Sequence, residues 1–166
     1  MKEITAVIFD MDGVLIDSQP LHYMADVESM KKYGVYKEQE FYEKYAGTTT
    51  PDRMRALNEL FKLNADVDEM VAVREQMILD IMKKEEIFPV RGIPELLKSI
   101  KSKGMTTAVA SSSGYELINM VLEKLGIAQY FDCITSGIDV KHGKPAPDVF
   151  LLAAERINKS PEECVV

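Results

Sequence analysis

The sequence lacks long apolar runs and contains little cysteine. No stretch reaches the roughly 18 uninterrupted apolar residues of a membrane span. The first residues lack the charged start and apolar core of a signal peptide, so we expect no membrane partner and a cytoplasmic location. The two cysteines, Cys133 and Cys164, show no metal-ligand spacing. This pattern predicts reduced, packed thiols rather than a metal site or a structural disulfide.

Clusters of basic residues are also absent. The 166-residue chain has a formal net charge of -7 and no lysine or arginine stripe that could neutralise a phosphate backbone, so we expect no nucleic-acid partner. A small anionic substrate would need local positive charge instead. The length and the 46% hydrophobic content suit one compact domain with an inserted subdomain.

Short β-rich runs alternate with helical periodicity over most of the chain. Residues 4–9 read as a strand buried on both faces, because the apolar residues are continuous rather than alternating. Residues 106–110 and 133–135 read as two more strands, and helices are predicted over 94–104 and 115–125. Strand, helix and strand in alternation predict a parallel α/β sheet with helices on its faces.

Residues 17–86 differ, because they show helical patterns and no convincing strand. Thr50 is predicted to cap one of these helices, with Pro51 at its first position. Most of the ten methionines fall in this segment, where they either fill a small helical core or form an adaptable wall facing a substrate. The prediction is an α/β core of 1–16 and 87–166, interrupted by a helical insert.

Two aspartates follow the first predicted strand. Ligands of open parallel sheets bind outside the carboxyl ends of the strands, where Asp10 and Asp12 lie, and Gly13 allows the chain to turn there. One carboxylate could attack phosphorus while the other gives and takes a proton. Mg²⁺, which prefers oxygen ligands, would relieve their mutual repulsion. The alternative is a turn with two solvated acids.

The stretch DMDGVLIDS at 10–18 resembles the first motif of the haloacid dehalogenase superfamily. The helical insert that follows it resembles that superfamily's first type of cap, and the closest likeness is to the β-phosphoglucomutase-like phosphatases. The resemblance implies a Rossmann-like core with a helical cap. It also implies Mg²⁺-dependent hydrolysis of a small phosphorylated metabolite, such as a sugar phosphate, through an aspartyl phosphate. Asp10 would be the nucleophile, Asp12 the general acid and base, and both would be metal ligands.

Two later segments resemble further motifs of the superfamily. In VASSS, Ser111 matches the hydroxyl that binds the transferring phosphoryl group, and in KHGKPAPDVF, Lys144 matches the phosphate-binding lysine. The amides of Ser112 and Ser113 begin a predicted helix, whose N-terminus favours an anion. The alternatives are that these serines only cap the helix and that Lys141 takes the place of the matched lysine.

The insert offers its own candidates for substrate binding. Gly47, Thr48 and Thr50 belong to a hydroxyl-rich stretch before a helix, which could contact a sugar or another polyol. The ordinary interpretation of this composition is a loop at a helix start. His22, at the start of the insert, could at most face the cleft.

The sequence departs from the mutase pattern at two positions. Where phosphoglucomutases carry a cap arginine that grips the distal phosphate, this chain has Thr50, although Arg53 lies one helical turn on. The lysine that the mutase has shortly after the second motif is replaced by Gly114. Both losses weaken the binding of a bisphosphate, so hydrolysis of a monoester is favoured over mutase chemistry.

Residues 160–166 resemble the start of the strand that carries the superfamily's fourth motif. Family members continue with an acidic pair that supplies further metal ligands, whereas this sequence stops at Val166. We therefore expect an unfinished sheet edge that promotes self-association. Three explanations stay open: a fragment of a longer enzyme, a site completed by another chain, or an impaired relative that binds phosphate without turnover.

Overall fold

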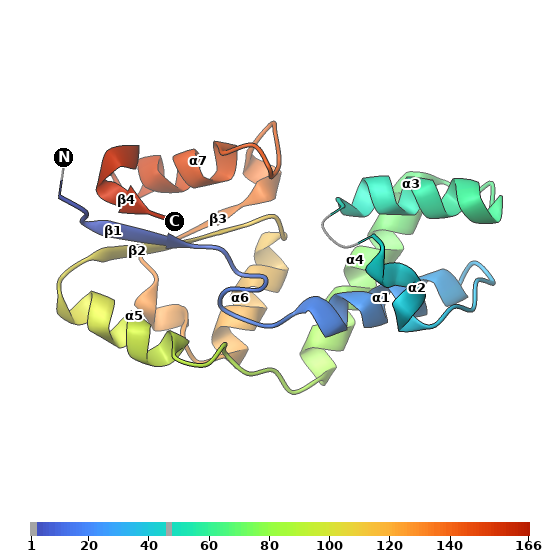
Figure 1. Ribbon diagram of the computed structural model, residues 1–166, viewed down its shortest axis with the longest axis horizontal. Coiled ribbons are helices and arrows are strands. Elements are labelled where there is room, and N and C mark those ends of the chain that lie inside the picture. Colours follow the sequence, from blue (N-terminus) through green and yellow to red (C-terminus); the bar gives the residue numbers. More distant parts are fainter. Residues whose placement is uncertain (1–2, 46–47) are drawn as a thin grey trace. The chain divides into compact units, whose positions relative to one another are not determined.

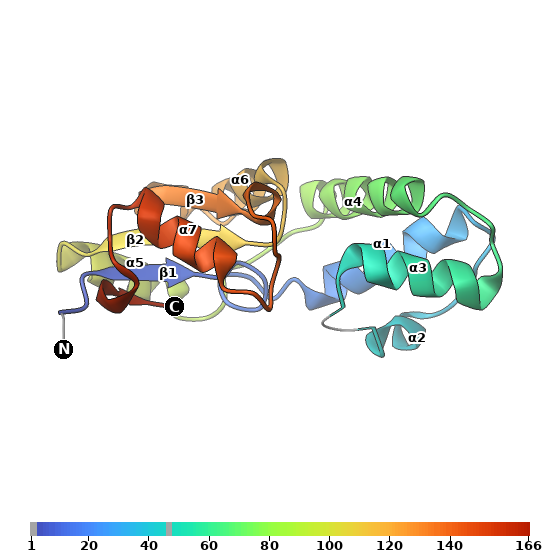
Figure 2. The same ribbon diagram turned by 90° about the horizontal axis from the view of Figure 1, so that it is seen from above.

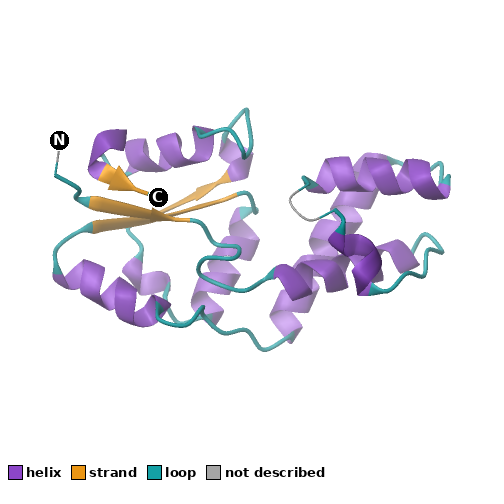
Figure 3. Cartoon of the chain, viewed as in Figure 1, coloured by secondary structure: helices purple, strands orange, loops and turns teal. Residues whose placement is uncertain are grey.

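The computed structural model describes residues 3–45 and 48–166, and these form two compact units. One unit comprises Met1–Asp17 and Ile87–Val166, and the other comprises Ser18–Glu86. The strands all lie in the first unit, whereas the described part of the second contains helices and loops (Figure 3). No helix in the described ranges is long and apolar enough to cross a membrane.

The first unit is built on a parallel sheet of four strands in the order β3-β2-β1-β4. The strands are β1 (Ala6–Phe9), β2 (Thr106–Ser111), β3 (Cys133–Ser136) and β4 (Cys164–Val165). This confirms the predicted α/β fold, with β1 starting two residues later than expected. At the sheet edge β4 pairs only with Ala6 and Val7, so self-association through this edge stays a prediction.

Helices cover both faces of this sheet. Their bounds are α5 (Ile93–Ser102), α6 (Tyr115–Lys124) and α7 (Asp148–Arg156), with short 3-10 turns η1 (Ala128–Tyr130), η2 (Gly137–Asp139) and η3 (Pro161–Glu163). α7 lies on one face, and α5 and α6 lie on the other (Figures 1 and 2). The sequence pattern did not single out α7, which begins directly after the proline-rich segment of the third motif.

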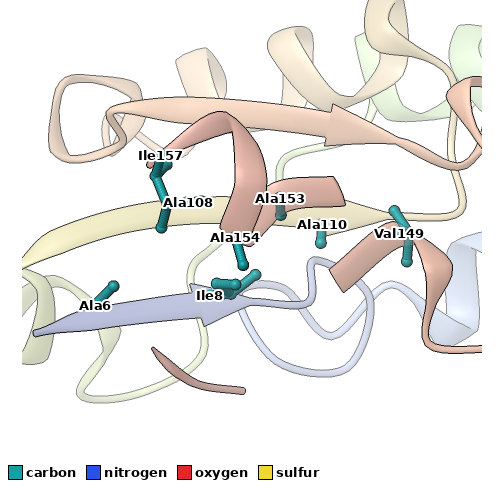
Figure 4. Packing of buried hydrophobic residues seen from close by; sticks show 8 residues of the cluster. All are labelled: Ala6, Ile8, Ala108, Ala110, Val149, Ala153, Ala154 and Ile157. Atoms are coloured by element: carbon teal, nitrogen blue, oxygen red, sulfur yellow. The ribbon is translucent and has the colours of Figure 1, made fainter. Parts of the chain in front are cut away.

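Small side chains let α7 pack closely on the sheet. Alternate residues of β1 and β2 point to the same face, where they meet one side of the helix (Figure 4). The buried cluster consists of Ala6, Ile8, Ala108, Ala110, Val149, Ala153, Ala154 and Ile157. Val149 lies at the Ala110 end of the cluster, so the start of α7 is placed beside the carboxyl ends of β1 and β2.

The second unit is a group of helices with its own core. Its elements are α1 (Gln19–Lys31), α2 (Gln39–Glu43), α3 (Thr50–Phe61) and α4 (Val67–Lys84). Met30, Met54 and Met70 are fully buried in this core together with Tyr42 and Leu57. Their burial favours the interpretation of the methionines as core residues over a substrate-facing wall.

The start of α3 differs from the sequence prediction by one residue. Thr49 is the N-cap, because its hydroxyl accepts a hydrogen bond from the backbone N–H of Asp52 at 3.3 Å. Thr50 is instead the first helical residue, and its hydroxyl donates to Glu75 Oε1 at 2.9 Å. The predicted cap at Thr50 was therefore wrong, since three consecutive threonines give the sequence no signal to choose among them.

Candidate active site

The two aspartates of the first motif lie on a tight turn at the end of β1. Met11, between them, is fully buried, whereas Asp10 and Asp12 are partly exposed. The carbonyl of Met11 accepts hydrogen bonds from the N–H groups of Leu15 (2.9 Å) and Ile16 (3.2 Å). Gly13 has φ +76°, a conformation that favours glycine. The buried Met11 thus anchors a turn that leaves both carboxylates at the carboxyl end of β1.

Lys144 approaches the first of these carboxylates. Its ammonium Nζ lies 2.7 Å from Asp10 Oδ1 and donates a hydrogen bond to the carbonyl of Ala110 at 3.1 Å. The N–H of Met11 also donates to Asp10 Oδ1, at 2.7 Å. Oδ1 therefore has two donors, while Oδ2 has no partner among the described residues. Of the two candidate lysines, it is Lys144 and not Lys141 that contacts Asp10.

Ser111 ends β2, on the strand beside β1, and it is fully buried. Its hydroxyl oxygen accepts a hydrogen bond from the N–H of Ser113 at 3.1 Å. Ser136, at the end of β3, donates its hydroxyl to the carbonyl of Ser113 at 2.6 Å. A Cβ added to Gly137 would lie 3.0 Å from the Cα of Ser112, so this loop is packed tightly against the end of β3.

The three serines do not cap α6. The N-cap of that helix is Gly114, and no side chain makes a capping hydrogen bond there. Ser111 is held one residue beyond Ala110, whose carbonyl binds Lys144. The structure therefore brings Asp10, Lys144 and the end of β2 together, with Ser111 next to them along the chain.

Three polar side chains near these residues, Tyr115, Asp139 and Arg156, bind one another and are called the clip below. Arg156 Nη1 lies 2.7 Å from Asp139 Oδ2 and donates to the Tyr115 hydroxyl at 2.8 Å. The Tyr115 hydroxyl also donates to Asp139 Oδ2. That hydrogen bond, followed by the Arg156 guanidinium, lowers the pKa of Asp139. The clip joins the first residue of α6 to η2, which precedes the loop of Lys144.

The donor set at the turn fits a magnesium ion. Asp10 and Asp12 supply oxygen atoms, the kind of ligand that Mg²⁺ prefers. Within the described ranges there is no group of three or more acidic, histidine or cysteine side chains that could hold a metal. A Mg²⁺ ion held at Asp10 and Asp12 would keep several of its waters, as this ion commonly does.

Three candidates of the helical unit, His22, Thr48 and Arg53, belong to a polar network around the buried Asp26. Arg53 donates from Nη1 to Asp26 Oδ2, and it also donates to the carbonyl (3.2 Å) and hydroxyl (3.4 Å) of Thr48. Arg74 donates from Nε to Asp26 Oδ1 at 3.1 Å, and its Nη2 lies 3.0 Å from His22 Nδ1. Asp26, Arg53 and Arg74 are all buried, and sequence reasoning missed the first and last of them.

The two remaining candidates of this unit are Thr50 and Gly47. Thr50 is tied to Glu75, which also lies 3.5 Å from Arg74 Nη1, so it contacts the edge of the same network. Gly47 lies outside the described residues.

A comparison with protein families decides the affiliation. The family described as haloacid dehalogenase-like hydrolase matches residues 7–166. The chain belongs to the haloacid dehalogenase-like hydrolases. This haloacid dehalogenase-like chain is 32% identical over 164 residues to the phosphorylated carbohydrates phosphatase of Thermotoga maritima, covering 97% of this chain and 74% of that protein. It is 33% identical over 167 residues to the fructose-1-phosphate phosphatase YqaB of Escherichia coli, covering 99% of this chain and 86% of that protein.

Solved structures of haloacid dehalogenase-like proteins have the same fold. The β-phosphoglucomutase of Clostridium difficile superposes with a TM-score of 0.79 at 28% identity, covering 97% of this chain and 74% of that one. The resemblance found in the sequence is thereby confirmed: the chain is a haloacid dehalogenase-like phosphatase of the β-phosphoglucomutase-like subfamily. It is shorter than these relatives.

Proposed function

We propose that the protein hydrolyses a small phosphate monoester, a sugar phosphate, through an aspartyl phosphate formed on Asp10. The observation that carries this proposal is the 2.7 Å contact between Lys144 Nζ and Asp10 Oδ1 at the carboxyl ends of β1 and β2. A cation beside a carboxylate suits phosphoryl transfer, because negative charge spreads over the phosphoryl oxygens in the transition state.

The first step forms the covalent intermediate. Asp10 Oδ2 attacks phosphorus, the bond between phosphorus and the ester oxygen breaks, and Asp12 gives its proton to the leaving oxygen. Lys144 neutralises charge on the phosphoryl oxygens, and the Ser111 hydroxyl donates a hydrogen bond to one of them. The amide of Ser112, in the loop before α6, adds a donor for the same group, while the amide of Ser113 binds the Ser111 hydroxyl oxygen and so orients that hydroxyl.

The second step restores the enzyme. A water molecule attacks the phosphorus of the aspartyl phosphate and gives its proton to Asp12, and the bond between phosphorus and Asp10 breaks. Inorganic phosphate leaves, and both carboxyl groups return to their starting protonation states. Asp10 and Asp12 would hold Mg²⁺, which when bound would supply positive charge that stabilises the transferring phosphoryl group.

The substrate class is inferred from the relatives and from the helical unit. Both reported phosphatases are named for phosphorylated sugars, and this chain is 32% and 33% identical to them. We assign residues 17–86 as the cap that selects the ester. His22, Gly47, Thr48 and Thr50 are its proposed sugar contacts. The core, residues 1–16 and 87–166, carries the chemistry.

The state of Arg53 supports hydrolysis over mutase chemistry. A mutase would need a cap cation to hold a second phosphate, but the Arg53 side chain is only 8% exposed and is bonded to Asp26 and Thr48. Its contact with Thr48 suits a role in holding the threonine loop that precedes α3. We therefore assign Arg53 to substrate binding through Thr48 rather than through direct contact with a distal phosphate.

The test is phosphate release from a panel of sugar phosphates and one aryl phosphate, with and without Mg²⁺. Asp10→Asn removes the nucleophile, and Asp80→Asn, on the exposed side of α4, is the matched control. We expect metal-dependent release by the wild type and by Asp80→Asn, and loss of release in Asp10→Asn. Normal turnover by Asp10→Asn would overturn the mechanism.

A further inference from the structure

The ammonium group of Lys144 is surrounded on three sides by different elements of the core. It contacts Asp10 Oδ1 at the end of β1 (2.7 Å) and the carbonyl of Ala110 in β2 (3.1 Å). It also lies 4.8 Å from the ring centroid of Phe150, the third residue of α7. An ammonium has three N–H donors, so two oxygen acceptors leave one side for the aromatic ring.

Phe150 is held in place by the packing of α7. The ring packs against the buried cluster between α7 and the sheet, and its neighbour Val149 is 1% exposed within that cluster. The face of an aromatic ring carries partial negative charge and attracts a cation within about 6 Å of its centroid. A ring on a helix whose inner side packs on the sheet can therefore hold a cation carried by the loop beside it.

Lys144 needs such an attachment point because its own side chain is flexible. A lysine ammonium sits on a four-carbon stem with many rotamers, and this side chain is 23% exposed. The backbone around it is stiffened by Pro145 and Pro147, which fix where the stem begins but not where it ends. Among the residues that the structure describes, the contacts of the tip are with Asp10, Ala110 and Phe150.

We propose that Phe150 is a positioning residue that holds the Lys144 ammonium at the Asp10 carboxylate through the face of its ring. This inference rests on the proposed function, since Lys144 must stand at the nucleophile before a phosphoryl group arrives. The rival explanation is that Phe150 only fills space under α7, and the two explanations differ in which substitutions should matter.

Three variants separate positioning from packing. Phe150→Leu keeps an apolar side chain and removes the ring face, whereas Phe150→Tyr keeps the ring face. Val149→Ala, on the same helix, removes core packing and leaves the ring in place. The steady-state kinetics of the best ester and the thermal unfolding temperature would be measured for each variant.

Positioning predicts that Phe150→Leu lowers kcat/KM about three- to tenfold. Phe150→Tyr should stay within about twofold of the wild type. Val149→Ala should lower the unfolding temperature and leave kcat/KM within about twofold when assayed well below that temperature. Wild-type kcat/KM in Phe150→Leu, or an equal loss in Val149→Ala, would overturn the inference.

A second readout does not depend on turnover. The rate at which an amine-reactive acetylating reagent modifies Lys144 can be followed by mass spectrometry and compared with the rate at exposed Lys98. Phe150→Leu should raise the Lys144 rate about threefold or more, and Phe150→Tyr should not. An unchanged rate in Phe150→Leu would overturn the inference whether or not the protein hydrolyses esters. A wild type without turnover but with the expected change in rate would refute the proposed function and leave the positioning role standing.

Discussion

Arg53 of α3 donates a hydrogen bond to Asp26 of α1 inside the helical unit, and their side chains are 8% and 0% exposed. Arg74 of α4 binds the other oxygen of the same carboxylate. Three helices are thus joined through one buried aspartate that pairs with two arginines. A buried charge is tolerated when it is paired and hydrogen-bonded, and removing one partner leaves the other charges uncompensated.

Asp26→Asn should therefore destabilise the helical unit by about 3–5 kcal/mol, because both guanidinium groups would lose the buried carboxylate that they share. Hydrogen exchange of the α1 and α3 backbone amides measures this local free energy of opening. The control is Glu28→Gln on the same helix, which breaks an exposed ion pair with Lys31 (2.6 Å) and should cost at most about 1 kcal/mol. Equal exchange in the two variants would contradict the role given to Asp26.

The Tyr42 hydroxyl, unlike the Asp26 carboxylate, is a fully buried polar group without a hydrogen-bond partner among the described residues. Burial, followed by the nearby charge of Asp26, raises the pKa of Tyr42 to about 12. Tyr42→Phe should leave the free energy of unfolding unchanged or raise it by up to about 1 kcal/mol, because it removes a buried polar group that has no hydrogen bond within the described ranges. Tyr115→Phe, which loses bonds to Asp139 and Arg156, should instead destabilise the protein.

The raised pKa of Tyr42 also predicts a pH dependence. In the unfolded chain the phenol ionises near 10.0, whereas in the folded protein it stays neutral to about 12. The unfolded state therefore loses its proton first, so stability is fully present below pH 10 and falls between pH 10 and 12. Chemical denaturation of the wild type should show a larger loss over this range than Tyr42→Phe. Parallel curves would show that the phenol titrates alike in both states.

The network of Asp26, Arg53 and Arg74 could have been predicted from charged residues that occur at buried positions of the helical apolar pattern. Arg74 stands four residues after Met70 and four before Ile78, so it lies on the buried line of α4. Asp26 lies between Tyr23 and Met30 on the buried side of α1 in the same way. A charge at a core position predicts a buried partner, but periodicity alone does not say which residue of another helix supplies it.

The active-site turn was predictable for a different reason. A continuous apolar strand followed by two aspartates and a glycine specifies the end of a buried strand and a turn within a few residues. The contact between Lys144 and Phe150 gave no such local signal, because it depends on how α7 packs on the sheet. α2 was missed because its five residues are too few to establish a helical period.

The clip at Asp139 predicts a dependence on acid pH. Tyr115 and then Arg156 hold the pKa of Asp139 below its ordinary value of 3.8, so its contribution to stability is present above that pH. The contribution is lost as the pH falls through the lowered folded value. Asp139→Asn should therefore be less stable than the wild type at pH 7, and the difference should shrink below about pH 4. A difference that stays constant down to pH 2 would refute the linkage.

Lys144 supplies the most direct test of the phosphoryl site. If its ammonium meets charge that develops on the phosphoryl oxygens, Lys144→Met should lower kcat by about 10²- to 10³-fold, since a preorganised donor at a developing charge has an effect of that size. Lys141→Met, three residues away, keeps the contact with Asp10 and should retain wild-type kcat. Kinetics of both variants with the best ester would be compared at saturating Mg²⁺. If Lys141→Met were the inactive variant, the lysine assignment would be reversed, and the contact between Lys144 and Asp10 would be structural rather than catalytic.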